Sequence, residues 1–274
     1  MELFVTDLDG TLINKDRQVT KKSEEIINEL IKSGMNFTVA TARTPATAVE
    51  ILQNLDLKLP VALMNGVLIY DTKELKYIDI KDINIESTYK ILDIFEKYNK
   101  NPLVYGIVDN HLWVYHKEFE HAYEYNFYKE RADKELKTFV KISNYKESVL
   151  KSSIINFVAF DEYEKIKSIA EEIEKIEGIN VNYYKDVYED CYFLEAYSSE
   201  ASKANGIKYL SKYINYKNVI CFGDNLNDIP MFELANEAYA TANATEEVKK
   251  IATGVIGSCE EVGVAEFLKE RFQN

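Results

Sequence analysis

Apolar runs alternate with amphipathic stretches near the N-terminus. Leu3–Thr6, Phe37–Ala40 and Val61–Met64 are short, apolar and rich in β-branched residues, as buried strands are. Between them, one stretch after Thr20 and another after Thr44-Pro45 repeat apolar positions every three or four residues, and both openings suit a helix N-terminus. Strands and helices that alternate in this way predict a parallel α/β sheet.

The middle of the chain follows another pattern. Leu103–Val108 and Leu112–Tyr115 are aromatic and β-branched, and Asp109-Asn110 between them predicts a hairpin. Further strands are expected over Ile154–Phe160, Val181–Tyr184 and Tyr192–Tyr197, and a helix over Tyr163–Glu177. Helices and a strand then alternate again to the end of the chain.

Together the two patterns predict an α/β fold in which an inserted α+β domain interrupts a parallel-sheet core. We expect the core over residues 1–81 and 198–274 and the inserted domain over residues 82–197. The length of 274 residues agrees with two domains. The composition, 46% hydrophobic and 29% charged, is that of a globular protein rather than a disordered or fibrous one.

The chain is strongly acidic. It has 33 Lys and Arg against 46 Asp and Glu, a net charge of −13. Such a surface repels nucleic acids and anionic membranes, so neither is expected as a partner. It also repels anionic substrates, so a phosphate site would need local positive charge or a metal ion.

The sequence also bears on location. The chain has three cysteines, Cys191, Cys221 and Cys259. They form no CxxC pair and are too few for a disulfide framework, which suits the reducing cytoplasm. No apolar run approaches the roughly 20 residues of a membrane span. Met1–Val5 resembles a strand rather than a signal peptide. We therefore expect a cytoplasmic protein, and the sequence gives no indication of its oligomeric state.

Acidic side chains follow two of the predicted strands. Asp7 and Asp9 come directly after the first strand, and Asp224 and Asp228 follow Val219–Phe222. Ligands of open α/β sheets bind at the carboxyl ends of the strands, so these four side chains are expected to meet. Clustered carboxylates repel one another without a cation, and hard oxygen ligands suit Mg²⁺.

Two further residues could bind an anion. Thr41 ends the second strand and offers a hydroxyl and a backbone N–H group. Lys203 begins a helix, where the dipole and the unpaired N–H groups favour anions. Most threonines at strand ends and most lysines at helix starts are structural or solvated, so either residue alone is a weak indication. Their order along the chain, together with the acidic loops, supports an anion site.

Four segments carry a family resemblance. They are Asp7-Leu8-Asp9-Gly10-Thr11-Leu12, Ala40-Thr41-Ala42-Arg43, Ser202-Lys203 and Gly223-Asp224-Asn225-Leu226-Asn227-Asp228. In this order they resemble the four motifs of the haloacid dehalogenase-like (HAD) superfamily, and most closely those of its Cof-type phosphatases. The stretches 65–71 and 243–249 resemble that group as well, so the likeness covers essentially the whole chain. Ala42 and Ala204 stand where the family often has glycine, and neither change removes a catalytic group.

The resemblance implies a Rossmann-like core with an inserted cap of the larger, second class. It also implies phosphoryl transfer through a covalent aspartyl-phosphate, in a phosphoric monoester hydrolase. Asp7 would attack the phosphorus, and Asp9 would protonate the leaving oxygen and then activate water. Mg²⁺ would be held by Asp7, the backbone carbonyl of Asp9 and Asp224, with Asp228 supporting the metal shell.

The resemblance further implies how the phosphate is held. Thr41, with the N–H groups of Ala42 and Leu8, would bind phosphoryl oxygens from one side, and Lys203 and Asn227 from the other. The resemblance therefore implies four catalytic residues, Asp7 and Asp9 of the first motif together with Thr41 and Lys203. The substrate would be a small phosphorylated metabolite, with sugar phosphates first and nucleotides or phosphorylated cofactors as alternatives. The inserted domain would recognise the leaving group.

Other functions fit parts of this pattern. A phosphomutase or another phosphotransferase would use the same nucleophile. A true dehalogenase lacks the second aspartate of the first motif, which is present here as Asp9. A non-catalytic phosphate-binding regulatory protein would have lost groups that this chain keeps, namely Asp7, Lys203 and Asp224.

Residues outside the four motifs have simpler explanations. His111, His116 and His121 lie close together in the sequence and could form a metal site, but the first two fall in different strand contexts. Arg43 could pair with a carboxylate of the site or remain solvated. Trp113 and most tyrosines are expected in the core of the inserted domain.

Overall fold

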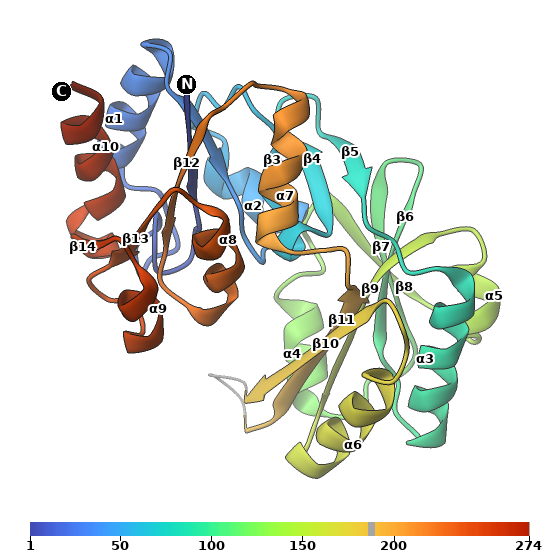
Figure 1. Ribbon diagram of the computed structural model, residues 1–274. Coiled ribbons are helices and arrows are strands. Elements are labelled where there is room, and N and C mark those ends of the chain that lie inside the picture. The colour runs from blue at the N-terminus through green and yellow to red at the C-terminus, as the bar shows by residue number, and fades with distance from the viewer. Residues whose placement is uncertain (186–189, 274) are drawn as a thin grey trace. The chain divides into compact units, whose positions relative to one another are not determined.

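The computed structural model describes residues 1–185 and 190–273. Its chain forms two compact units, one of Met1–Asp79 with the chain from Ala201 onward and the other of Ile80–Glu200 (Figure 1). The predicted boundaries, after residues 81 and 197, lie two or three residues from these. Below, the first unit is called the core and the second the cap.

The core is built on a five-stranded parallel sheet with the order β14-β13-β12-β1-β2. Its strands are β1 (Glu2–Thr6), β2 (Asn36–Val39), β12 (Asn218–Gly223), β13 (Glu237–Thr241) and β14 (Gly254–Ile256). The central strand β1 pairs with β12 on one side and with β2 on the other. The loops that follow these three strands therefore start at the same edge of the sheet.

Helices cover both faces of this sheet (Figure 1). On one face lie α1 (Lys21–Lys32) and α10 (Gly263–Gln273), and Phe267 of α10 contacts the rings of Phe222 and Tyr239. On the other face α7 (Lys203–Tyr209), α8 (Ile229–Leu234) and α9 (Glu246–Ile251) bury apolar side chains against β1, β12 and β13. As predicted, Thr20 caps α1, because its hydroxyl accepts from the Ser23 N–H group.

The third predicted strand does not continue the parallel sheet. β3 (Val61–Leu63) meets it only through one bridge, Ala40 to Ala62, and belongs to a separate sheet with β4 (Leu68–Asp71) and β5 (Lys76–Ile80). The reason is a tight reversal after β3, where Met64 and Asn65 have φ of 50° and 55°. This reversal sends β4 back antiparallel to β3. Between β2 and β3 runs α2 (Pro45–Leu52), which begins at Pro45 as the sequence predicts.

The cap contains a six-stranded sheet with the order β10-β11-β9-β6-β7-β8. Its strands are β6 (Leu103–Val108), β7 (His111–His116), β8 (Lys137–Lys141), β9 (Ser153–Asp161), β10 (Ile179–Lys185) and β11 (Tyr192–Ser198). The predicted hairpin of β6 and β7 is confirmed, with positive φ at both Asp109 and Asn110. All described pairs are antiparallel except that of β7 with β8.

One face of the cap sheet packs against helices α3 (Ile85–Lys97) and α6 (Tyr163–Ile173), which enclose an apolar core around Phe95, Phe157 and Ile169. α6 ends four residues before the predicted Glu177. On the opposite face, Phe127 of α4 (Ala122–Lys129) contacts Phe160 and Phe193. A short helix, α5 (Tyr145–Val149), joins β8 to β9. Over residues 1–185 and 190–273, no helix has the length and apolarity that crossing a bilayer requires.

Candidate active site

The site starts where β1 ends. Asp7 follows Thr6 directly, and its backbone N–H donates to the Phe222 carbonyl of β12 at 2.9 Å. Its side chain is 7% exposed. Pairing with the neighbouring strand therefore fixes this carboxylate between the loops that follow β1 and β12, which are called the two acidic loops below.

Lys203 links the two loops. Its Nζ lies 2.6 Å from Asp7 Oδ1 and 2.6 Å from Asp228 Oδ1, and its side chain is fully buried. Burial alone would lower the pKa of Lys203, but the two carboxylates outweigh it and raise that pKa, so the ammonium stays charged. The predicted pair of strand ends and the predicted lysine thus meet in one buried cluster.

Asp228 organises the second loop. Its Oδ2 accepts from the N–H groups of Asp224 and Asn225 at 2.8 and 3.0 Å, while its Oδ1 accepts from Lys203. Its side chain is completely buried. Both oxygens are thus engaged, and the carboxylate holds the loop in shape. Gly223 makes room for it, because a Cβ there would lie 2.6 Å from Asp228 Oδ2.

Asp224 completes the cluster. Its Oδ1 accepts from the Thr11 hydroxyl at 3.1 Å, which ties the second loop to the first. Burial and the nearby Asp228 raise the pKa of Asp224 to about 6. Burial also raises the pKa of Asp7, and Lys203 opposes this effect. Ionising these carboxylates together is therefore unfavourable without further positive charge.

The charges of the cluster fit a divalent cation. Carboxylate oxygens of Asp7, Asp224 and Asp228 lie within 4.8 Å of one another. Lys203 supplies one positive charge against three negative ones, which leaves an excess of two. All the donors are hard oxygen atoms, the ligand type that Mg²⁺ prefers.

Asp9 points to a different partner. The Arg43 guanidinium donates two hydrogen bonds to the Asp9 carboxylate, Nε to Oδ2 at 2.7 Å and Nη2 to Oδ1 at 2.6 Å. The Asp9 side chain is 55% exposed, so this pair is open to solvent. Of the two interpretations of Arg43 from the sequence, pairing with a carboxylate is the one that the structure shows. No local signal in the sequence distinguishes them, because the two residues lie on different loops.

The remaining predicted residues lie at the same edge of the sheet. Thr41 is buried two residues after the end of β2, and its hydroxyl accepts from the Arg43 N–H at 3.3 Å. Leu8 is buried, and Ala42 is exposed. Asn227 is exposed in the second acidic loop and donates to Asn65 Oδ1 at 3.4 Å. Asn65 lies in the turn after β3 and belongs to the stretch 65–71 that resembles the Cof-type phosphatases, but nothing in the sequence predicts a role for it in the site.

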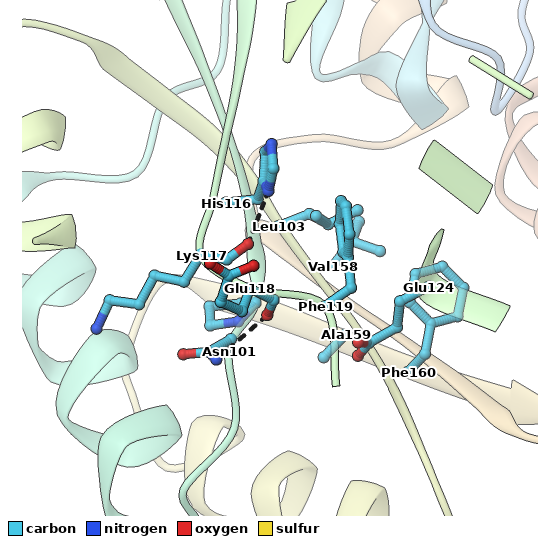
Figure 2. A pocket seen from close by; sticks show the side chains of 11 residues that line it. Asn101, Leu103, His116, Lys117, Glu118, Phe119, Glu124, Val158, Ala159 and Phe160 are labelled. Atoms are coloured by element: carbon cyan, nitrogen blue, oxygen red, sulfur yellow. Dashed lines mark hydrogen bonds between the residues drawn. The ribbon is translucent and has the colours of Figure 1, made fainter. Parts of the chain in front are cut away.

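The three histidines do not form a common site. His111 bonds the Thr138 hydroxyl, and His116 stacks on Phe119 at the wall of a small cavity in the cap (Figure 2). His121 lies 3.7 Å from Asp161, near Glu120. That acidic group already has a cation, because the buried Lys100 ammonium is 2.9 Å from Glu120 and 3.3 Å from Asp161.

Comparison with known proteins identifies the family of the chain. Residues 4–268 match the model of the haloacid dehalogenase-like hydrolases. The chain belongs to this family.

Two phosphatases of Bacillus subtilis are among its relatives. YwpJ is 27% identical, over 98% of this chain and 99% of its own length. YitU, a 5-amino-6-(5-phospho-D-ribitylamino)uracil phosphatase, is 24% identical, over 98% of this chain and 97% of its own. The predicted enzyme class, a phosphatase, is confirmed.

Solved structures share the fold. A haloacid dehalogenase-like hydrolase from Bacteroides thetaiotaomicron has a TM-score of 0.80 at 21% identity, over 98% of this chain and 99% of that one. The HAD subclass IIB sugar phosphatase BT4131 has a TM-score of 0.73 at 19% identity, over 99% of both chains. The predicted fold class, a parallel α/β core with an inserted cap, is confirmed.

Proposed function

We propose that this protein is a Mg²⁺-dependent phosphatase that hydrolyses phosphate esters of small polyhydroxylated metabolites, sugar phosphates first among them, in the cytoplasm. The observation that carries the proposal is the buried contact between Asp7 and Lys203 at the strand end. In this contact the carboxylate that would serve as nucleophile lies beside a buried cation, and oxygens of Asp224 and Asp228 lie within 4.8 Å of it. Such a constellation suits in-line phosphoryl transfer.

The reaction has two steps. In the first, a carboxylate oxygen of Asp7 forms a bond to phosphorus, and the bond from phosphorus to the ester oxygen breaks while Asp9 gives that oxygen a proton. In the second, Asp9 takes a proton from water, the water oxygen bonds to phosphorus, and the aspartyl ester is released as free carboxylate and phosphate. Because Arg43 holds both oxygens of Asp9, this pair must open before the proton can move.

The residues of the cluster would also bind the metal or support the metal site. Asp7 and Asp224, with the backbone carbonyl of Asp9, would hold Mg²⁺, which when bound neutralises charge on the phosphoryl group. Asp228 has both oxygens engaged, so it would support the site through the loop N–H groups and Lys203.

The phosphoryl oxygens would be bound mainly by groups at the strand ends. Lys203 would supply positive charge, Thr41 its hydroxyl, and Leu8 and Ala42 their N–H groups. Asn227 would donate from the second loop.

The substrate class rests on the relatives and on the cap. YitU is described as acting on a phosphorylated ribityl compound, and BT4131 as a sugar phosphatase. Both descriptions name esters of polyhydroxylated leaving groups. The core residues discussed above would engage only the phosphoryl group, its ester oxygen and the metal, so discrimination between esters is assigned to the cap.

A screen of phosphorylated metabolites for phosphate release tests this proposal. Sugar and polyol phosphates should be the best substrates, activity should vanish in excess chelator, and added Mg²⁺ should restore it. Assaying the products for phosphorylated acceptor as well as free phosphate separates hydrolysis from phosphotransfer. Full activity in excess chelator, or transfer without release of phosphate, would contradict the proposal.

Replacing Gly10 with alanine should weaken metal binding. Gly10 has φ of +74°, and an added Cβ would lie 2.2 Å from Asp224 Oδ2, so the carboxylate must move. The Mg²⁺ concentration for half-maximal activity should rise about 10–100-fold, as when other supports of metal ligands are removed.

Gly34→Ala is the matched control for this change. Gly34 has φ of +104°, so alanine strains the backbone there too, but its Cβ would meet nothing within 4 Å. If both variants shift the Mg²⁺ requirement equally, the effect comes from backbone strain and not from Asp224.

A further inference from the structure

A row of polar side chains crosses the cap sheet on the face opposite α3 and α6. Tyr105 of β6 pairs in register with Asn156 of β9, and Glu195 of β11 lies on the next strand. Side chains alternate between the faces of a sheet. Phe157 and Ala196, their neighbours in sequence, point into the apolar core beneath the helices. Tyr105, Asn156 and Glu195 therefore share the other face.

Asn156 has an unpaired polar atom. The residue is 3% exposed, and its side-chain amide donates to the Glu195 carboxylate. Within residues 1–185 and 190–273, its Oδ1 is buried and has no hydrogen-bond partner. Buried acceptors without a donor are rare because they lose their bonds to water. The row therefore offers an acceptor for which the described part of the protein supplies no donor.

A second tyrosine extends the row. Tyr197, two residues after Glu195 on β11, accepts from Asn182 Nδ2 at 2.8 Å through its hydroxyl oxygen. Its hydroxyl hydrogen is therefore left to donate to another acceptor. Burial raises the pKa of Tyr105 and of Tyr197, so both hydroxyls stay neutral and can donate as well as accept.

A cation near Tyr105 is engaged elsewhere. Arg131 lies close enough to Tyr105 to affect it electrostatically. However, its Nη1 donates to the Phe127 carbonyl and to Glu130, and its guanidinium stacks on the Phe127 ring at 3.9 Å. The row of hydroxyls, amide and carboxylate thus suits neutral groups that both donate and accept, and not a second anion.

We propose that Tyr105, Asn156, Glu195 and Tyr197 form a hydroxyl-binding row that selects esters with a polyhydroxylated leaving group. This inference rests on the proposed phosphatase function and identifies the residues that determine its specificity. The Glu195 carboxylate would accept hydrogen bonds from ligand hydroxyls, and Asn156 Oδ1 would accept a hydrogen bond from a further ligand hydroxyl. The two tyrosine hydroxyls would donate hydrogen bonds to ligand oxygens.

Glu195 is well suited to this role. Burial raises its pKa to about 7, and the Asn156 hydrogen bond only partly opposes the shift. Hydrogen bonds from ligand hydroxyls would stabilise its ionised form. A site built around such groups discriminates against analogues that lack the hydroxyls, because its polar atoms are then left unpaired.

The test compares Glu195→Gln and Asn156→Ala with the parent on three esters. They are ribitol 5-phosphate, glucose 6-phosphate and 4-nitrophenyl phosphate, of which the last has no leaving-group hydroxyls beyond the ester oxygen. With the first two, kcat/KM should fall about 10–100-fold, mainly through KM, and the loss with 4-nitrophenyl phosphate should be at least about tenfold smaller. Glu172→Gln is the matched control, because Glu172 lies on α6, on the opposite face, and accepts from Lys97 and Tyr98.

A binding measurement separates failure of the row from failure of the phosphatase function. Calorimetry with ribitol 5-phosphate and Mg²⁺ on the Asp7→Asn protein, with and without Glu195→Gln, should show about 10–100-fold weaker binding in the double variant. This result would support the row even if the parent protein hydrolysed none of the esters. Equal losses on all three esters, an unchanged Kd, or no binding at all would overturn the inference.

A further variant addresses loss of folding. If Glu195→Gln lowers the Tm, Glu195→Asp, which keeps the carboxylate, should recover part of the preference for the two polyol esters.

Discussion

Replacing Asp7 with asparagine is expected to abolish turnover. The side chain keeps its shape and can still accept from Lys203 through its amide oxygen, so the fold should survive. It loses the nucleophilic oxygen that forms the covalent bond to phosphorus. Removal of a catalytic nucleophile lowers kcat by about 10⁴–10⁶-fold, which phosphate release from the best ester of the screen would measure.

An exposed acid of the same unit serves as the control. Asp56→Asn removes a negative charge from the surface of the core and should leave kcat unchanged. A thermal melt of both variants checks that the folds are intact. If Asp7→Asn retained a tenth or more of the parent turnover, the covalent mechanism would be wrong.

Replacing Lys203 with methionine should damage both stability and activity. Methionine fills much of the same space, but Asp7 and Asp228 then lose their shared cation in a fully buried site. Breaking a buried ion pair by removing one partner costs about 3–5 kcal/mol, and chemical denaturation would measure this change in the free energy of unfolding. Turnover should fall to background, because the phosphoryl group loses the same positive charge.

A double variant separates the two effects. Lys203→Met with Asp228→Asn removes one of the two stranded carboxylates, so it should recover part of the lost stability and none of the activity. Lys208→Met, at an exposed position of the same helix, should change neither. Recovery of turnover in the double variant would show that Lys203 acts only as a structural counter-ion.

The sequence predicts the centre of the site better than its surroundings. Asp7 and Asp224 could be located because each follows an apolar strand, and parallel strands bring their carboxyl ends together. Lys203 could be placed only at a helix start, and its contact with both Asp7 and Asp228 depends on how that helix packs. The bidentate grip of Arg43 on Asp9 and the loop bonds of Asp228 depend on side-chain directions that no spacing encodes.

The errors in the fold have a common physical origin. Val61–Leu63 reads like any other buried strand, and its departure from the parallel sheet follows from two backbone angles in the turn after it. The short strand β14, the half-exposed β5 and the small helices α4 and α5 carry weak periodicity, because only part of each is buried. The polar row of the cap depends on the register of strands that are far apart in the sequence.

The interrupted course of the core constrains how the protein is made on the ribosome. β1 is the central strand, but its partner β12 is synthesised only after the whole cap, and Asp7 lies 196 positions before Lys203 in the chain. Contacts of such long range are closed late in folding, since the intervening chain must first be ordered or looped out. During translation β1 therefore stays without its partner β12, and it can pair only with segments that leave the ribosome before the cap is complete. A nascent chain released before residue 203 lacks the cation between the two acidic loops, so incomplete products cannot assemble this centre.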